Sequence, residues 1–291
     1  MKSTKYVGGI LVFTSFVSAL LLFIEPRFAA SAEVRSTEII EVKSRFGVAV
    51  NFLIIKPDHP FASVILFEGG PGKLSLRKFF RKPVIGAPAG TVLVRSREEF
   101  AKSGLITVLV DAPSDQQQEG LKPSFRTSEE HLQDIRAVVS HLKKEAGLPV
   151  WLAGISLGTF SSANGAVRLN EDIDGFILLS GITRTIEWPS GWPKQRLLDM
   201  GLEKITIPAM IIYHKDDLCP DTPASDAPLI EKALVQSPKV EVVYVVGGRN
   251  EPNPQIPVHQ GCQPLTYHGF YGIDKQVVSA IVNFIKSNSK K

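Results

Sequence analysis

Cysteine is nearly absent from this sequence, which has only two in 291 residues. So few cysteines exclude a disulfide-dense secreted scaffold. A large excess of one charge is also missing, because 33 Lys and Arg oppose 29 Asp and Glu for a net charge of +4. Internal repeats and low-complexity linkers are lacking as well. With 44% hydrophobic and 21% charged residues, the composition excludes a disordered, collagen-like or polytopic membrane chain and is that of an ordinary globular protein.

The first 32 residues have the pattern of an export signal. Lys2 and Lys5 precede a largely apolar run over 6–24, and the small residues at 30–32 suit cleavage. The run approaches the roughly 20 residues that span a bilayer, so an uncleaved membrane anchor is the alternative. Either way, we expect a periplasmic or secreted protein that meets a membrane only for export or through that anchor.

Residues 33–291 are expected to form one large domain. Without the signal the net charge falls from +4 to +2, because Lys2, Lys5 and Arg27 outweigh Glu25 there. So small a net charge does not indicate nucleic-acid binding, and we expect no nucleic-acid partner.

Strand-like and helix-like patterns alternate along this domain. Eight segments are expected to be strands, the last six because they are largely apolar runs, as in a parallel sheet covered on both faces: 38–42, 48–55, 63–67, 106–110, 150–153, 175–179, 209–213 and 240–246. Thr127 and Glu130 have capping-box spacing before an amphipathic helix that stops at Gly147, and a second such helix covers 277–285. The alternation predicts a doubly wound α/β sheet.

Two irregular stretches follow strand ends, where an open α/β sheet places its ligands. They are residues 73–91 and 181–204. Either can frame a substrate cleft, and both are too short for a large lid. Trp188 and Trp192, in the second stretch, either line an acyl pocket or pack the loop.

Residues 154–158 read Gly-Ile-Ser-Leu-Gly and match G-x-S-x-G between an expected strand and a helical stretch. A nucleophile elbow needs its serine on a tight strand-to-helix turn, and flanking glycines let the backbone crowd there without a Cβ clash. Ser156 is therefore the candidate nucleophile. The alternative is a plain Gly/Ser turn.

A serine hydroxyl needs a base to take its proton, and the sequence holds six histidines. In enzymes with such an elbow the chain order is serine, acid, histidine, and the histidine lies between the last strand and the last helix. His268 fits that place best, and His259 is the alternative. The others are expected to be solvated surface or turn residues: His59, His131, His141 and His214.

The acid is expected directly after the strand at 209–213, where Asp216 and Asp217 stand. A carboxylate there would accept the imidazole N–H and stabilise the imidazolium formed when the serine loses its proton. Asp217 is favoured because three residues carry it off the strand end. Asp216 remains the alternative acid.

The oxyanion site is expected to combine two backbone N–H groups. One belongs to Leu157, which follows the nucleophile, and the other comes from the glycine-rich loop at 68–72. Gly70 is the preferred second donor, Gly69 is possible, and Pro71 has no N–H. A phosphate-binding loop is the rival interpretation, but the Lys-Ser/Thr pair of a P-loop is missing.

These features together resemble the α/β-hydrolase superfamily, and an exported bacterial branch of it is most similar. The resemblance to the superfamily rests on Gly-Gly-Pro-Gly at 69–72, Asp111-Ala112-Pro113, the elbow at 154–158, Asp217 and His268. The similarity to the exported bacterial branch rests on Leu93–Arg97 and the cysteine pair. It implies a mostly parallel eight-stranded doubly wound sheet with helices on both faces and no large lid. It also implies no cofactor and a Ser156/Asp217/His268 triad that hydrolyses its substrate through an acyl-enzyme. Glu68 departs from the pattern, since many esterases of the superfamily carry a histidine there.

The two cysteines, Cys219 and Cys262, stand near the expected acid and base in the sequence. Outside the cytoplasm such a pair most simply forms a disulfide, which here would tie the acid loop to the histidine loop. The rival is a metal site that adds His214 and His259, although the C-x-x-C spacing common in structural zinc sites is absent.

We therefore expect an exported serine hydrolase that cleaves a small-molecule ester or related acyl substrate and uses no metal. The alternatives are a peptidase or acyltransferase on the same triad, or a non-enzymatic binding protein that retains the fold. A basic cluster is expected to be a solvated face, with attraction of an anionic ligand as the alternative: Arg77, Lys78, Arg81 and Lys82.

Overall fold

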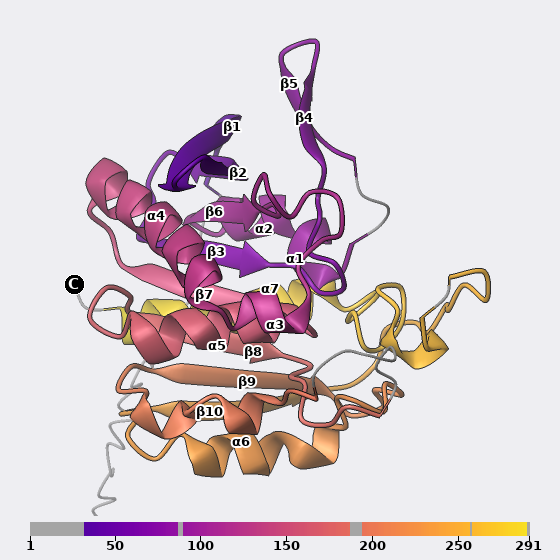
Figure 1. Cartoon of the computed structure of the whole chain (residues 1–291). Helices are drawn as coiled ribbons and strands as arrows, with labels where there is room; N and C mark the ends of the chain where they lie inside the picture. Colours follow the sequence, from indigo (N-terminus) through magenta and orange to yellow (C-terminus); the bar gives the residue numbers. More distant parts are fainter. Residues whose placement is uncertain (1–31, 87–89, 187–193, 257, 290–291) are drawn as a thin grey trace, which may run out of the picture. The chain divides into compact units, whose positions relative to one another are not determined.

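The computed structural model describes residues 32–86, 90–186, 194–256 and 258–289. Within these ranges one sheet is built from β1 (Val34–Arg45), β2 (Val48–Pro57), β3 (Ala62–Phe67), β6 (Leu105–Val110), β7 (Val150–Ile155), β8 (Gly175–Leu179), β9 (Ala209–His214) and β10 (Val240–Val245). The spatial order is β1-β2-β6-β3-β7-β8-β9-β10 (Figure 1). β2 runs antiparallel to both its neighbours, and all other neighbouring strands are parallel. The expected mostly parallel eight-stranded sheet is confirmed.

All eight expected strands are present, and β8 has the bounds that the sequence predicts. β3, β6, β7, β8 and β9 are buried at every residue, as parallel strands covered on both faces require. β10 lies at the edge of the sheet and is mostly half-buried.

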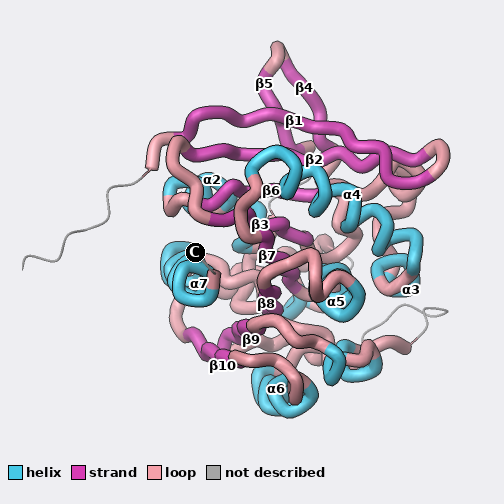
Figure 2. The backbone as a smooth tube through the Cα atoms, turned by 90° about the vertical axis from the view of Figure 1, so that its left-hand side faces the viewer, coloured by secondary structure: helices cyan, strands magenta, loops and turns pink. Residues whose placement is uncertain are grey.

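Helices cover both faces of the sheet (Figure 2). The described α-helices are α1 (Val92–Arg95), α2 (Arg97–Lys102), α3 (Pro123–Arg126), α4 (Glu129–Ala146), α5 (Gly158–Arg168), α6 (Ala227–Ala233) and α7 (Asp274–Asn288), with short 3₁₀ turns at Leu197–Asp199, Leu202–Lys204, Ala224–Asp226 and Gln260–Cys262. Apolar side chains of α4, α5 and α6 share one core cluster with the sheet. Those of α1, α2 and α7 share the other.

The capping pair expected at the start of α4 is wrong. Ser128 is the N-cap, and its Oγ accepts a hydrogen bond from the backbone N–H of His131 at 3.1 Å. Thr127 cannot serve because it ends α3, where its N–H donates to the carbonyl of Pro123. The stop is confirmed, since Gly147 adopts a left-handed φ of 64° at the C-cap.

The first irregular stretch contains a hairpin that sequence reasoning missed, formed by β4 (Leu76–Phe79) and β5 (Lys82–Ile85). It is a separate two-stranded sheet and projects away from the main sheet (Figure 1). Phe80 and Arg81 in its turn have φ values of 44° and 66°. Tight hairpin turns require such angles and usually signal them with Asn-Gly, which is missing here.

Two expectations fall on residues outside the described ranges. The proposed export signal lies there except for Ala32, and so do Trp188 and Trp192. In the part of the chain that is described, none of the helices combines the length and apolar character needed to span a bilayer.

The strand register brings the loops of the expected site together. Phe67 at the end of β3 pairs with Gly154 of β7, and Ile155 pairs with Leu179 at the end of β8. The glycine-rich loop, the elbow and the segment after β8 therefore leave the same edge of the sheet side by side.

Candidate active site

Ser156 stands on a tight turn between β7 and α5. Its φ of 53° lies in the left-handed region that a serine seldom adopts. A Cβ on Gly154 would lie 2.2 Å from the carbonyl oxygen of Gly158, and one on Gly158 would lie 2.1 Å from that of Phe67. Neither position tolerates a side chain, so both glycines of the motif are explained by close backbone packing around the serine.

The expected acid and base are in contact. His268 Nδ1 lies 3.0 Å from Asp217 Oδ2, and the two side chains are 1% and 0% exposed. Asp217 also accepts hydrogen bonds from the N–H of Cys219 at 2.9 Å and from Thr222 Oγ1 at 3.0 Å. Asp216 is exposed instead, so the structure brings the favoured acid to the histidine and not the alternative.

The second ring nitrogen of His268, Nε2, is buried and has no hydrogen-bond partner in the described part of the chain. Ser180 Oγ donates to the carbonyl oxygen of His268 at 3.1 Å, and Ser156 N–H donates to the carbonyl oxygen of Leu179 at 3.0 Å. Leu179 and Ser180, adjacent residues at the end of β8, thus hold the nucleophile and the candidate base. No hydrogen bond joins their side chains in this structure, and such bonds are often long before substrate binds.

Two backbone N–H groups beside the serine are free. Those of Leu157 and Gly70 donate no hydrogen bond to any described residue. Gly69 packs against the nucleophile, since a Cβ there would lie 3.1 Å from Ser156 Cβ. The glycine-rich loop therefore lies directly against Ser156, and Gly70, with a φ of 52°, follows at once. Two free donors beside a nucleophile are what an oxyanion site needs.

A buried arginine that sequence reasoning missed holds this loop. Arg126 is 0% exposed, and its Nη2 donates to the carbonyl oxygens of Glu68 at 3.0 Å and Gly70 at 3.1 Å. Its Nη1 donates to Ser161 Oγ at 2.8 Å. Burial lowers the pKa of Arg126, while the carboxylate of Glu68 opposes that shift. An arginine ending a four-residue helix looks like a surface charge in the sequence, so no signal pointed to it.

Glu68, the departure from the superfamily pattern, anchors the loop to α1. Its carboxylate accepts hydrogen bonds from the N–H of Thr91 at 2.8 Å and from Thr91 Oγ1 at 2.6 Å. Burial raises the pKa of Glu68, and these hydrogen bonds together with Arg95 and Arg126 act in the opposite direction. The carboxylate thus ties the expected oxyanion loop to the start of a helix.

Arg95, at the end of that helix, contacts the histidine loop. Its guanidinium donates to the carbonyl oxygens of Gly269 at 2.9 Å and Pro264 at 3.1 Å, and to Asp274 Oδ1 at 2.8 Å. α1 therefore connects the glycine-rich loop on one side with the residues around His268 on the other. Within the run 93–97, Arg95 is therefore the residue that holds the histidine loop against α1.

The expected disulfide between Cys219 and Cys262 is present. It joins the loop after β9 to the loop before α7, next to Asp217 in the sequence. Both sulfurs are taken up by the bond, so neither is left for the rival metal site. Among the described residues, no three His, Cys, Asp or Glu side chains gather as a metal ion would require.

Two histidines expected at the surface are buried. His131 is 1% exposed and its Nε2 lies 2.9 Å from Ser161 Oγ, next to Arg126. His214 is 0% exposed and stacks on Tyr267 with ring centroids 4.5 Å apart. The expectation failed because polar neighbours along the chain do not reveal which helix or strand face the core covers.

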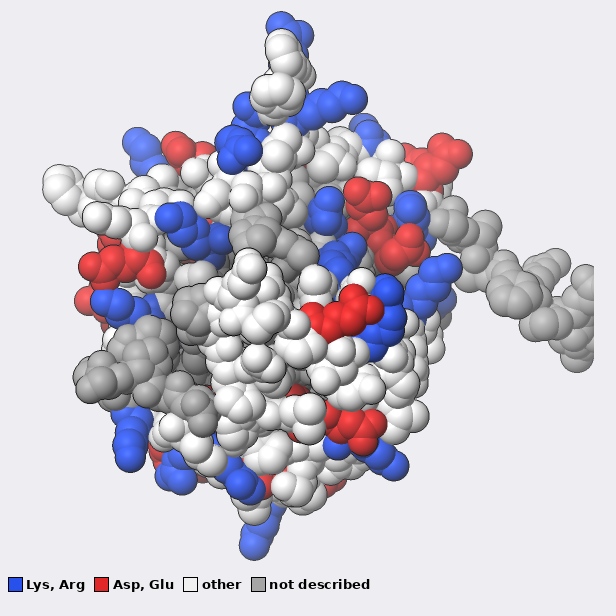
Figure 3. Space-filling view, turned by 90° about the vertical axis from the view of Figure 1, so that its right-hand side faces the viewer, with Lys and Arg blue, Asp and Glu red and all other residues white. Residues whose placement is uncertain are grey.

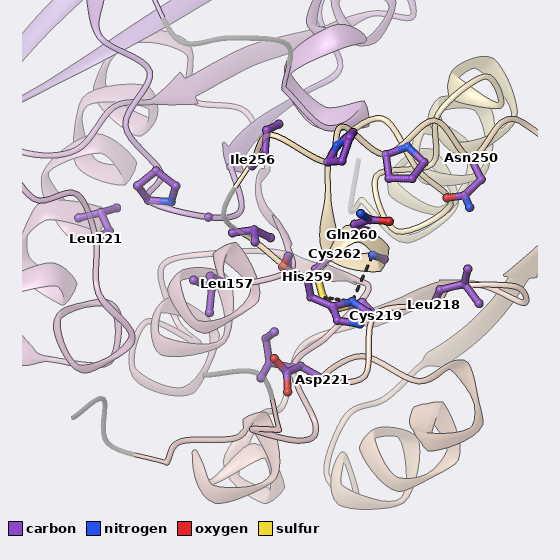
Figure 4. A pocket seen from close by; sticks show the side chains of 18 of the residues that line it. Leu121, Leu157, Leu218, Cys219, Asp221, Asn250, Ile256, His259, Gln260 and Cys262 are labelled. Carbon is purple, nitrogen blue, oxygen red and sulfur yellow. Dashed lines mark hydrogen bonds between the residues drawn. A yellow bond between two sulfur atoms is a disulfide. The ribbon is translucent and has the colours of Figure 1, made fainter. Parts of the chain in front are cut away.

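A cleft of about 990 Å³ opens in front of Ser156 (Figure 4). Leu121 lies on one side and Asn250 and Gln260 on the other, with Leu157 and the disulfide between them (Figure 4). Pro71 and further residues of 250–262 also line the cleft. The lining is mostly apolar: Leu157, Ile182, Leu218, Pro252, Pro254, Ile256 and Val258 belong to it.

The described lining differs from what the two irregular stretches suggest. None of the described residues of 73–91 lines the cleft, and among those of 181–204 Ile182 alone does. His259, the alternative base, lies in the wall, where its Nδ1 accepts the N–H of Gly261 at 3.1 Å, and it makes no described contact with Asp217.

Comparison with solved structures identifies the fold. An esterase of Pyrococcus furiosus superposes with a TM-score of 0.59 at 13% identity, over 88% of this chain and 92% of that one. Est1E of Butyrivibrio proteoclasticus with bound ferulic acid gives 0.58 at 16% identity, over 86% and 98%. A dienelactone hydrolase of Anabaena variabilis gives 0.59 at 14%, over 88% and 99%. By sequence, the chain matches no protein-family model and no curated protein. The chain has the α/β-hydrolase fold, as expected.

Proposed function

We propose that this chain is a serine hydrolase that cleaves an ester or related acyl substrate. The observation that carries the proposal is the buried contact between His268 and Asp217 at 3.0 Å, with Nε2 of the imidazole left free. An acid that holds Nδ1–H leaves the lone pair on Nε2, the form that a general base requires. The structural likeness to two esterases and a dienelactone hydrolase supports the same reaction class.

The proposed reaction follows from this arrangement. Ser156 Oγ attacks the carbonyl carbon while His268 Nε2 takes its proton, and Asp217 stabilises the imidazolium. The N–H groups of Leu157 and Gly70 bind the oxyanion. His268 then protonates the leaving alcohol, and a water molecule activated by the same histidine releases the acid from Ser156.

The cleft indicates the kind of substrate. A volume of about 990 Å³ with a largely apolar lining favours an ester with a bulky apolar group over a short acetyl ester. The disulfide suits an oxidising compartment and agrees with the proposed export of the protein through its N-terminal segment.

Labelling with a fluorophosphonate probe tests the assignment. The wild type should be labelled, and Ser156→Ala should lose both labelling and turnover. The matched control is Ser103→Ala, which removes an exposed serine at the end of α2 and should leave both unchanged. Unchanged labelling of Ser156→Ala would refute the proposed nucleophile.

A panel of substrates separates the alternatives. p-Nitrophenyl esters of increasing chain length, matched peptide anilides, and esters with an added alcohol acceptor distinguish an esterase, a peptidase and an acyltransferase. A wild-type protein that neither hydrolyses nor becomes labelled would be a binding protein that retains the fold.

A further inference from the structure

The tip of the β4–β5 hairpin exposes two adjacent aromatic side chains. Phe79 is 63% and Phe80 is 87% exposed, and their ring centroids lie 4.7 Å apart. The pair projects from a two-stranded sheet that shares no strand with the main sheet (Figure 1). Exposed aromatics gathered at one point usually mark an interaction site.

Cations surround this aromatic pair. All four residues of the basic cluster are exposed, and none of them forms an ion pair with a described residue: Arg77, Lys78, Arg81 and Lys82. No acidic residue occurs between Glu68 and Glu98. The projection at the top of Figure 3 carries blue Lys or Arg atoms at its end and again at its base, with uncharged atoms between them. Charge complementarity therefore requires an anionic partner.

The hairpin is rigidly held at its base. Leu76 and Ile85 pack against the core cluster shared by α1, α2 and α7. The buried carboxylate of Asp111 accepts hydrogen bonds from the N–H groups of Leu74 at 2.7 Å and Leu76 at 2.9 Å. These contacts fix the base of the hairpin before any partner arrives, which lowers the entropy cost of binding.

We propose that this hairpin tip docks the protein on an anionic lipid bilayer. Phe79 and Phe80 enter the boundary between headgroups and acyl chains, while the flanking Lys and Arg side chains contact lipid phosphates. A narrow tip suits a soft planar surface better than a protein, because a stable protein interface buries roughly 1,200–2,000 Å². A bilayer accepts two rings at a depth of about 5–10 Å.

Docking would limit the distance between the cleft and the lipid. Pro71, which lines the cleft, stands nine positions before Phe80, and that length of chain spans at most about 32 Å. The proposal itself does not depend on the catalytic assignment, because no tip residue lines the cleft or contacts the triad. It concerns the place where the protein works, whatever it cleaves.

Vesicle co-sedimentation tests the docking surface. The protein without residues 1–30 is suitable because Ser31–Lys291 forms a compact unit. We expect binding to phosphatidylcholine vesicles that contain phosphatidylglycerol, and at least about tenfold weaker binding to phosphatidylcholine alone, since each basic residue near an anionic surface contributes about fivefold. Binding should weaken as salt is raised.

Two sets of variants isolate the parts of the tip. Phe79→Ser with Phe80→Ser should reduce partitioning into anionic vesicles at least about tenfold. Replacing the four residues of the basic cluster by glutamine should abolish the preference for anionic lipid. The matched control is Phe46→Ser, which removes a fully exposed phenylalanine from the β1–β2 turn and should bind as the wild type does.

A fluorescence measurement follows insertion directly. The emission of a Phe80→Trp variant should shift to the blue with anionic vesicles and stay unchanged with neutral ones. Anionic binding that survives the loss of both phenylalanines would overturn the proposal. So would an equal loss in Phe46→Ser, or a phenylalanine-dependent dimer in size-exclusion chromatography without vesicle binding, which would make a second copy the partner.

Discussion

The disulfide gives the sharpest test of how the loops around the triad are held. Replacing Cys219 and Cys262 together by alanine removes the link and leaves no free thiol. The bond closes a loop of 43 residues, for which the chain-entropy relation gives about 4 kcal/mol of stabilisation at 25 °C. For a compact unit at Ser31–Lys291, with an unfolding entropy of about 2.1 cal/mol/K per residue, this corresponds to a fall in Tm of about 7 °C.

Thermal unfolding measured with and without reductant is the assay. The wild type should lose about 7 °C in reductant, and the double-alanine variant should have the lower Tm in both conditions. Turnover should fall as well, because the N–H of Cys219 donates to Asp217 Oδ1 at 2.9 Å. A wild type whose Tm and turnover are the same with and without reductant, while its thiols become titratable, would refute the reasoning.

Two further predictions concern backbone packing and pH. Gly158→Ala places a Cβ 2.1 Å from the carbonyl oxygen of Phe67, so urea titration should show a loss of about 1–3 kcal/mol together with reduced turnover, and a variant as stable and active as the wild type would contradict this. Hydrogen bonding from Arg184 holds the pKa of Asp226 below its ordinary value. The stabilisation is therefore complete above the ordinary carboxyl pKa of about 4 and is lost as pH falls through the lowered value. Asp226→Asn should cost about 1 kcal/mol at neutral pH and flatten the acid-side decline in Tm, whereas parallel curves would count against it.

The strands were predictable because burial on both faces leaves a pattern in the sequence. The parallel strands inside the sheet, such as Gly175–Leu179, are largely apolar and are buried at every residue, whereas β10 at the edge is mostly half-buried. β4 and β5 lacked that signal because they pair only with each other and carry Lys and Arg on exposed positions. Their turn at Phe80 and Arg81 adopts left-handed angles without the glycine or asparagine that usually announces them.

The candidate residues could be placed from the sequence where they stand just after a strand. Ser156 follows β7 and Asp217 follows β9, and the contact with His268 favours Asp217 over Asp216 as the candidate acid. Nothing in the sequence pointed to Arg126, and the run 93–97 contained Arg95 without indicating its role. Their roles arise from contacts with residues far along the chain, such as the 174 positions that separate Arg95 from Gly269.

Glu68 shows why a departure from a family pattern need not disturb the site. A histidine at this position would be neutral or cationic, whereas the glutamate accepts two hydrogen bonds from Thr91 and lies beside the guanidinium of Arg126. Arg126 in turn donates to the carbonyl oxygens of Glu68 and Gly70, so a buried cation holds the peptide units on both sides of the one that carries the Gly70 N–H. Arg126 of α3 and Thr91 at the start of α1 thus position the glycine-rich loop here. Exchanging Glu68 alone for histidine would leave the two Thr91 donors without their acceptor and would remove a negative charge that interacts electrostatically with Arg126. A histidine at this position would therefore need further changes around it.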